Sequence, residues 1–147
     1  MSAEASQPSL LPFVATQPLV DHHCHGVLRA GGADEGPVSP EGIAGLLNEA
    51  DGDAAADGMP FDSLAGLALR RWCPPLLGLA PHASAGEYAG RRAALGGDEV
   101  NRRFLGACGL AALCVDTGYS PAGLLSPAET AACAGAAAFE VVRLEQV

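Results

Sequence analysis

The chain has 147 residues, which suits one domain with its own core. Its net charge of −9, with eight arginines and no lysine, repels a phosphate backbone and argues against nucleic acid as a partner. The five irregularly spaced cysteines predict free thiols in a reducing compartment, and no apolar run is long enough to cross a bilayer. We therefore expect a cytoplasmic chain that binds neither nucleic acid nor a membrane.

The first predicted elements are a polar lead-in over residues 1–17 and a short strand over residues 18–24. Residues 29–97 are then predicted to form a helical insertion, which begins with segments rich in turn-forming residues. Within the insertion, Ser39 followed by Pro40 is typical of a helix start, with serine as the N-cap and proline in the first helical position. We expect the insertion to line the active site or to be a mobile segment without a role.

Two further helices are predicted inside the insertion. The first is expected to be capped by Asp62, to use Trp72 as a packing anchor and to end at Pro74, because proline lacks the N–H that a helix needs. The second begins at the capping box formed by Ser84 and Glu87.

The remaining elements alternate between helix and strand. Capping residues, glycines and apolar runs predict a helix from Asp98 to Gly109, a strand over Leu110–Val115, a helix from Ser126 to about Ala138 and a strand over Phe139–Glu145. A strand–helix–strand order indicates parallel strands joined by right-handed crossovers. The fold class is therefore α/β.

The strongest chemical signal lies at the end of the first predicted strand. Because side chains alternate between the faces of a strand, Asp21, His23 and His25 are expected on one face. His22 and Cys24 are expected on the other, with His22 as a structural histidine. Two imidazoles placed in this way can bind one cation, and Zn²⁺ accepts histidine nitrogen at about 2.0–2.1 Å.

We therefore expect His23 and His25 to bind a divalent metal, zinc in the first place, with manganese or iron as alternatives. Asp21 is expected to hydrogen-bond to a ligand rather than to bind the metal itself. The alternative interpretation is a pair of structural histidines with no metal.

The order Asp21-x-His23-x-His25 after a first strand resembles the opening motif of the amidohydrolase superfamily of metal-dependent hydrolases. The resemblance extends to four more segments, Leu67–Cys73, Glu99–Phe104, Val115–Tyr119 and Glu140–Glu145. Together they are similar to the amidohydrolase branch that is sometimes fused to glutamine-synthetase-like domains. The similarity covers about residues 12–147, which is only the first part of the family's domain.

The resemblance implies a (β/α)₈ TIM barrel, which needs about 250 residues. We therefore expect residues 18–147 to form the N-terminal portion of such a barrel: its first three parallel strands, with the helical insertion of residues 29–97 after strand 1. In the family, the remaining metal ligands and the catalytic acid or base come from later strands. We identify no catalytic residue in this chain.

In barrel enzymes the active site lies at the C-terminal ends of the strands. We expect Asp116, Arg143 and Glu145 at these ends. These three residues are our candidates for binding a small-molecule substrate, and Arg143 could hold a substrate carboxylate with two hydrogen bonds. The alternative is an ion pair of Arg143 with Glu145 or Asp116, which would have only a structural role at the open end of the barrel.

The activity that the resemblance implies is metal-assisted attack of water on a C–N or related bond. Two alternatives stay open: a non-catalytic α/β fragment or interaction module, and a metal-dependent decarboxylase of the same superfamily. We expect no turnover from the isolated 147-residue chain. Its free strand edges predict self-association.

Overall fold

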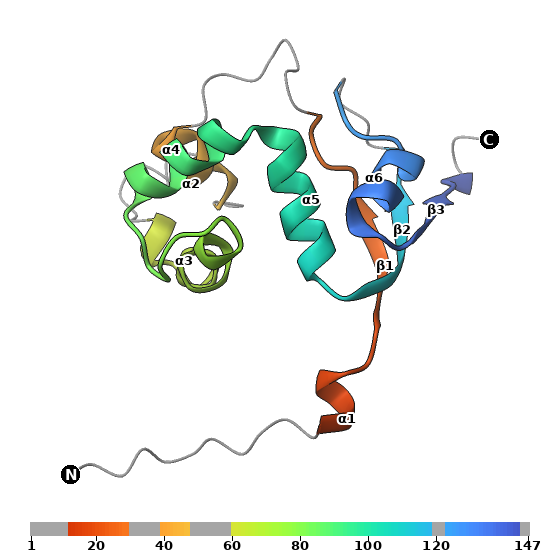
Figure 1. Ribbon diagram of the computed structural model, residues 1–147. Helices are drawn as coiled ribbons and strands as arrows, with labels where there is room; N and C mark the ends of the chain where they lie inside the picture. Colours follow the sequence, from red (N-terminus) through yellow and green to blue (C-terminus); the bar gives the residue numbers. More distant parts are fainter. Residues whose placement is uncertain (1–11, 30–38, 48–59, 119–122, 145–147) are drawn as a thin grey trace.

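The computed structural model describes residues 12–29, 39–47, 60–118 and 123–144 (Figure 1). Most elements lie within a few residues of where capping signals and apolar patterns predict them. In chain order the elements are α1 (Pro12–Ala15), β1 (Leu19–His25), α2 (Pro40–Leu46), the 3₁₀ helix η2 (Pro60–Asp62), α3 (Leu64–Leu76), α4 (Ala85–Leu95), α5 (Gly97–Ala107), β2 (Leu110–Asp116), α6 (Pro127–Ala134) and β3 (Ala137–Val141).

The three strands form one parallel sheet in the order β1-β2-β3. In the register, His25 stands opposite Asp116, and Asp116 stands opposite Val141. The last residues of all three strands are therefore level with one another. The predicted α/β class with three parallel strands is confirmed, and the carboxyl ends of the strands meet at a single edge.

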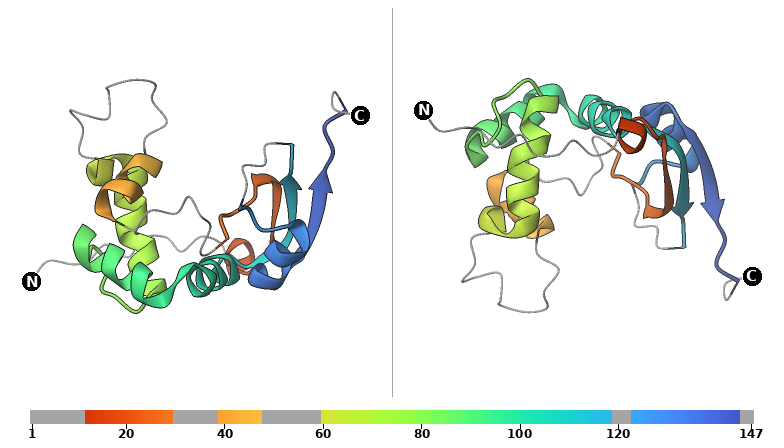
Figure 2. Two further views of the ribbon diagram at one scale, coloured as in Figure 1. Left: turned by 90° about the horizontal axis from the view of Figure 1, so that it is seen from above. Right: turned by 90° about the horizontal axis from the view of Figure 1, so that it is seen from below.

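One face of the sheet is covered by α5 and α6 (Figure 2). The core between them contains the buried side chains of Leu113, Val115 and Ala134, with Cys24 and Leu105 packed against them. Burial on this face accounts for alternate residues of β2, Leu113 and Val115, whereas the continuous apolar run is typical of a strand buried on both faces. Within the described residues, no helix lies on the opposite face of the sheet (Figure 2).

A second core holds α2, α3 and α4 together on the β1 side of the sheet (Figure 1). Its buried members are Ile43, Leu77, Tyr88, Ala89 and Val100. Helix α5 belongs to both cores, because Val100 and Phe104 pack into the helical one while Leu105, the next residue, packs beneath the sheet. No described helix is long and apolar enough to cross a membrane.

Helix α3 differs from the prediction at both ends. Its N-cap is Ser63, whose hydroxyl accepts from the Gly66 N–H, while Asp62 forms an ion pair with Arg70. Pro74 and its neighbour lie inside the last turn instead of ending the helix. Proline removes a backbone donor from the helix, but the freed Arg70 carbonyl accepts from the His82 N–H at 2.7 Å. Trp72 was predicted to be an anchor, but it is exposed.

The boundary between α6 and β3 also differs from the prediction. Gly135 has a φ of 65°, a left-handed conformation that ends the helix four residues before expected. Strand β3 therefore begins at Ala137 and ends at Val141, so Arg143 follows the strand instead of lying within it. The predicted strand residue Glu145 lies outside the described residues.

The chain that leaves β1 is tied to the start of α6. Leu28 and Leu124 form an antiparallel bridge, and Arg29 donates from both terminal nitrogens to the Glu129 carboxylate, one of them at 2.7 Å. Glu129 also closes the capping box of α6 with Ser126. These contacts fix the segments that follow β1 and precede α6 beside the carboxyl edge of the sheet.

The Glu129 pair predicts a specific pH dependence of stability. The Arg29 guanidinium, followed by hydrogen bonds from Ser126, lowers the pKa of Glu129 from 4.5 to about 2. Stability from this carboxylate is therefore fully present above about pH 4.5 and is lost as pH falls towards 2. In Glu129→Gln, the difference in unfolding free energy from the wild type should shrink over this range, as measured by urea denaturation at several pH values. Arg29→Gln should show the same convergence, and a difference that is constant with pH would contradict the assignment.

Candidate metal centre

Strand β1 contains a bulge between Asp21 and Cys24, which includes His23. Asp21 pairs with Leu113 and Cys24 with Val115, so three steps along β1 match two steps along β2. Simple alternation, which predicted Asp21 on the face of His23 and His25, does not hold through this bulge. The Asp21 carboxylate instead accepts from the backbone N–H of His23 at 3.2 Å, which stabilises the bulged backbone.

The imidazoles of His23 and His25 lie side by side at the end of β1. Their ring centroids are 5.3 Å apart and their planes are nearly perpendicular, at 88°. Both residues are exposed, whereas Cys24 between them packs towards the core beneath the sheet. The strand therefore presents two imidazoles together on the solvent side.

Asp116, the last residue of β2, completes a group with the two histidines. One ligand atom from each of the three residues lies within 4.8 Å of the others, and His23 Nε2 is 3.9 Å from Asp116 Oδ2. Ligands of a tetrahedral zinc ion lie about 3.3 Å apart when each bond is about 2.0 Å. Small side-chain rotations would therefore bring the three atoms to coordination distance.

The Asp116 carboxylate is held by Arg143 and by the backbone of Gly118. Arg143 donates from Nη2 to Oδ2 at 2.8 Å and from Nε at 3.1 Å, and the Gly118 N–H donates to Oδ1 at 2.8 Å. Arg143, followed by the Gly118 hydrogen bond, lowers the pKa of Asp116 to about 2. Asp116 is 3% exposed and its carboxylate is ionised at neutral pH.

The donor set fits a borderline metal ion. Two imidazoles and a carboxylate are ligands that Zn²⁺ accepts, and manganese and iron bind the same types of group. Three protein ligands leave a coordination position for water or substrate, as in catalytic zinc sites. A cavity of about 310 Å³ borders Asp116 and the start of α6, where Gly26, Thr117 and Ser126 also line it, but neither His23 nor His25 lines this cavity.

The remaining predicted site residues are placed as follows. Arg143 forms the ion pair with Asp116, one of the two roles that the sequence left open. His22 is exposed and is not part of the metal group. Asp116, expected to bind substrate, stands among the candidate metal ligands instead. Its signal in the sequence was its position at the end of a buried strand parallel to β1.

Gly118 allows Arg143 to lie close to the backbone. A Cβ at this position would overlap with Cδ and Nε of Arg143. Gly118→Ala should therefore displace the guanidinium from Asp116 and weaken zinc binding by roughly tenfold, the scale for lost partners of metal ligands. Competition with a chromophoric chelator measures this change. Gly90→Ala, where an added Cβ meets nothing within 4 Å, is the matched control and should bind zinc like the wild type.

Comparison with known proteins identifies no relative: no family model, no curated protein and no solved structure matches this chain.

Proposed function

We propose that His23, His25 and Asp116 bind a divalent metal, zinc in the first place, and that the site hydrolyses a C–N or related bond of a small molecule. The observation that supports this most directly is the convergence of the three ligand atoms at the carboxyl edge of a parallel sheet. The Asp-x-His-x-His motif that resembles the amidohydrolase opening supplies the reaction class. In this proposal the sheet is part of a (β/α)₈ barrel, where active sites lie at the same edge.

The chain's own residues would have separate tasks. His23 and His25 bind the metal as neutral imidazoles, and Asp116 adds a negative charge that favours the cation. Arg143 and Gly118 keep the Asp116 carboxylate oriented and ionised. The bound metal would lower the pKa of its water and polarise the scissile carbonyl.

This chain would contribute only part of the site. We assign no general base to the described residues, and the resemblance places the catalytic acid or base of the family on later strands. That observation favours a second candidate function, in which the chain binds a metal without turning over a substrate.

Two measurements on the purified chain separate these functions. Equilibrium dialysis with elemental analysis gives the zinc stoichiometry, and release of amine from a panel of small amides is followed with and without zinc. One zinc per chain supports the metal centre, and zinc-dependent release of amine supports hydrolysis. Stoichiometric zinc without release favours the non-catalytic function. No zinc uptake would refute both.

A further inference from the structure

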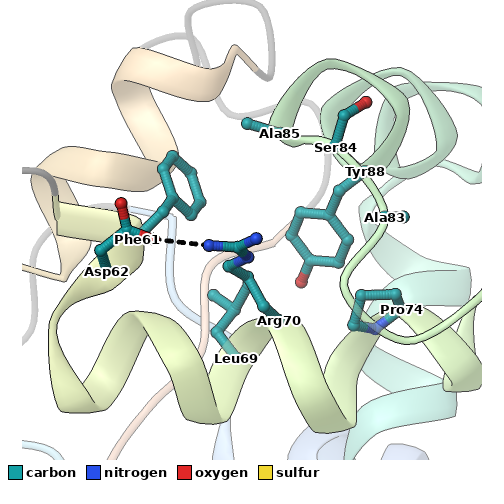
Figure 3. Close-up of a pocket in the computed structure, with 9 residues that line it drawn as sticks. All are labelled: Phe61, Asp62, Leu69, Arg70, Pro74, Ala83, Ser84, Ala85 and Tyr88. Atoms are coloured by element: carbon teal, nitrogen blue, oxygen red, sulfur yellow. Dashed lines mark hydrogen bonds and ion pairs between the residues drawn. The ribbon is translucent and has the colours of Figure 1, made fainter.

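The helical part of the molecule contains a separate cavity of about 220 Å³ (Figure 3). It lies between η2, α3 and the start of α4 and shares no lining residue with the candidate metal centre. Its volume is small for a binding site and would suit a molecule about the size of one aromatic ring.

The wall between α3 and α4 is built by an unusual backbone arrangement. Because Pro74 has no N–H, the Arg70 carbonyl has no partner in the helix and accepts instead from His82. His82 has a φ of 60°, a left-handed conformation that is rare outside glycine and asparagine. This turn brings Ala83 and Ser84 to the cavity and carries the chain into α4.

The walls of the cavity are apolar and include two aromatic rings. Phe61 comes from η2, Leu69 from α3 and Tyr88 from α4 (Figure 3). Tyr88 is only 2% exposed, and its hydroxyl accepts from Arg92 at 3.2 Å. Both the ring and its polar end are therefore fixed, so that the cavity keeps an apolar, aromatic side.

One cation, Arg70, points into this apolar space. Figure 3 shows its guanidinium directed between the rings of Phe61 and Tyr88. Its Nη1 donates to Asp62 Oδ1 at 2.6 Å. Within the described part of the chain, Nε and Nη2 make no hydrogen bond, so this edge of the guanidinium remains available to an acceptor.

The start of α4 adds donors at the same cavity. The capping box of Ser84 and Glu87 satisfies the N–H groups of the N-cap and of the third helical residue. The N–H groups of the first two helical residues have no partner among the described residues, and the first of these residues, Ala85, lines the cavity. Apart from the Asp62 carboxylate, which is paired with Arg70, these polar groups are donors, and donors select an acceptor group on a ligand.

We propose that this cavity binds a small monocarboxylate with a flat apolar body. The carboxylate would accept from Nε and Nη2 of Arg70, a fork that matches two oxygens, and the body would pack between Phe61, Leu69 and Tyr88. Asp62 occupies the other side of the guanidinium and holds it in place. The proposal concerns a site separate from the metal centre and holds whether or not that centre binds a metal.

The test is a ligand titration of the full chain followed by NMR, with benzoate as the probe and benzyl alcohol as its uncharged counterpart. Benzoate should shift the signals of Tyr88, Ala83 and the Arg70 Nε–H group in a saturable way. Benzyl alcohol should bind at least about tenfold more weakly, because it cannot form two charge-assisted hydrogen bonds.

Two matched variants separate the role of Arg70 from a general effect of charge. Arg70→Gln should remove the preference for benzoate. Arg71→Gln, which changes the neighbouring exposed arginine that stacks on Trp72, should retain it. If Arg70→Gln does not fold, Arg70→Lys keeps the charge without the fork and should reduce the preference. Equal binding of both probes by the wild type, equal effects of the variants at positions 70 and 71, or no saturable binding would each overturn the proposal.

Discussion

Replacing His23 and His25 together with alanine should lower the affinity for zinc by more than about 100-fold. This double change removes two of three candidate ligands, whereas loss of an outer partner alone costs about 10- to 100-fold. The remaining Asp116 carboxylate is already engaged by Arg143 and Gly118 and would bind zinc poorly without the imidazoles. Competition with a chromophoric chelator gives the affinity of each protein.

His22→Ala is the matched control for this double variant. It removes an imidazole from the same strand, and His22 is exposed and outside the metal group. We expect it to bind zinc within about twofold of the wild type, since its imidazole is not one of the three candidate ligands. Equal loss of affinity in His22→Ala and in the double variant would show that zinc binds to exposed histidines without a defined site.

Leu77→Ala should lower the free energy of unfolding by about 3 kcal/mol. Leu77 is 0% exposed and lies in the core formed by α2, α3, α4 and α5. Removing its side-chain atoms takes away apolar contacts and leaves a cavity that neighbours fill only in part. Urea denaturation followed by circular dichroism at a helical wavelength measures the loss.

Leu64→Ala makes the same chemical change in the first turn of α3, where the side chain is 89% exposed. Its effect should stay within about 0.5 kcal/mol, as for most surface substitutions. Similar losses in both variants would mean that Leu77 does not occupy a packed core. The two leucines therefore test the helical core independently of any ligand.

The elements that sequence predicted well depend on local signals. The capping boxes at Ser84 and Ser126 form as expected, because each joins residues three positions apart. The run from Leu110 forms a strand with one face packed against helices, and the alternation of strands and helices gave the parallel order. These features need only neighbouring residues or the order of elements, both of which can be read from sequence.

The features that sequence missed depend on contacts between distant segments. The bulge in β1 follows from its pairing with β2, about 90 residues later, so alternation alone misplaced Asp21. The last turn of α3 contains Pro74 and is still helical. The reason is that the His82 N–H, from the following loop, donates to the Arg70 carbonyl, which Pro74 leaves without a partner in the helix. Asp116 joins the histidines only through the register of two parallel strands.

The placement of the histidine pair was predicted more successfully than that of the residues around it. His23 and His25 are neighbours in sequence, and a strand places them together whatever lies beyond it. Arg143 reaches Asp116 across 27 residues, from a segment that was expected to belong to β3. The sequence therefore indicated the imidazoles and left an ion pair of Arg143 with Asp116 as one alternative, while the approach of Asp116 to the histidines required the fold.

The central claim is that these two imidazoles and one carboxylate bind the same ion. X-ray absorption at the zinc edge of the chain loaded with one equivalent of zinc tests it most directly. We predict about two imidazole nitrogens at roughly 2.0–2.1 Å, with oxygen completing the coordination. A spectrum with only oxygen ligands, or one that is unchanged in the double histidine variant, would contradict the account.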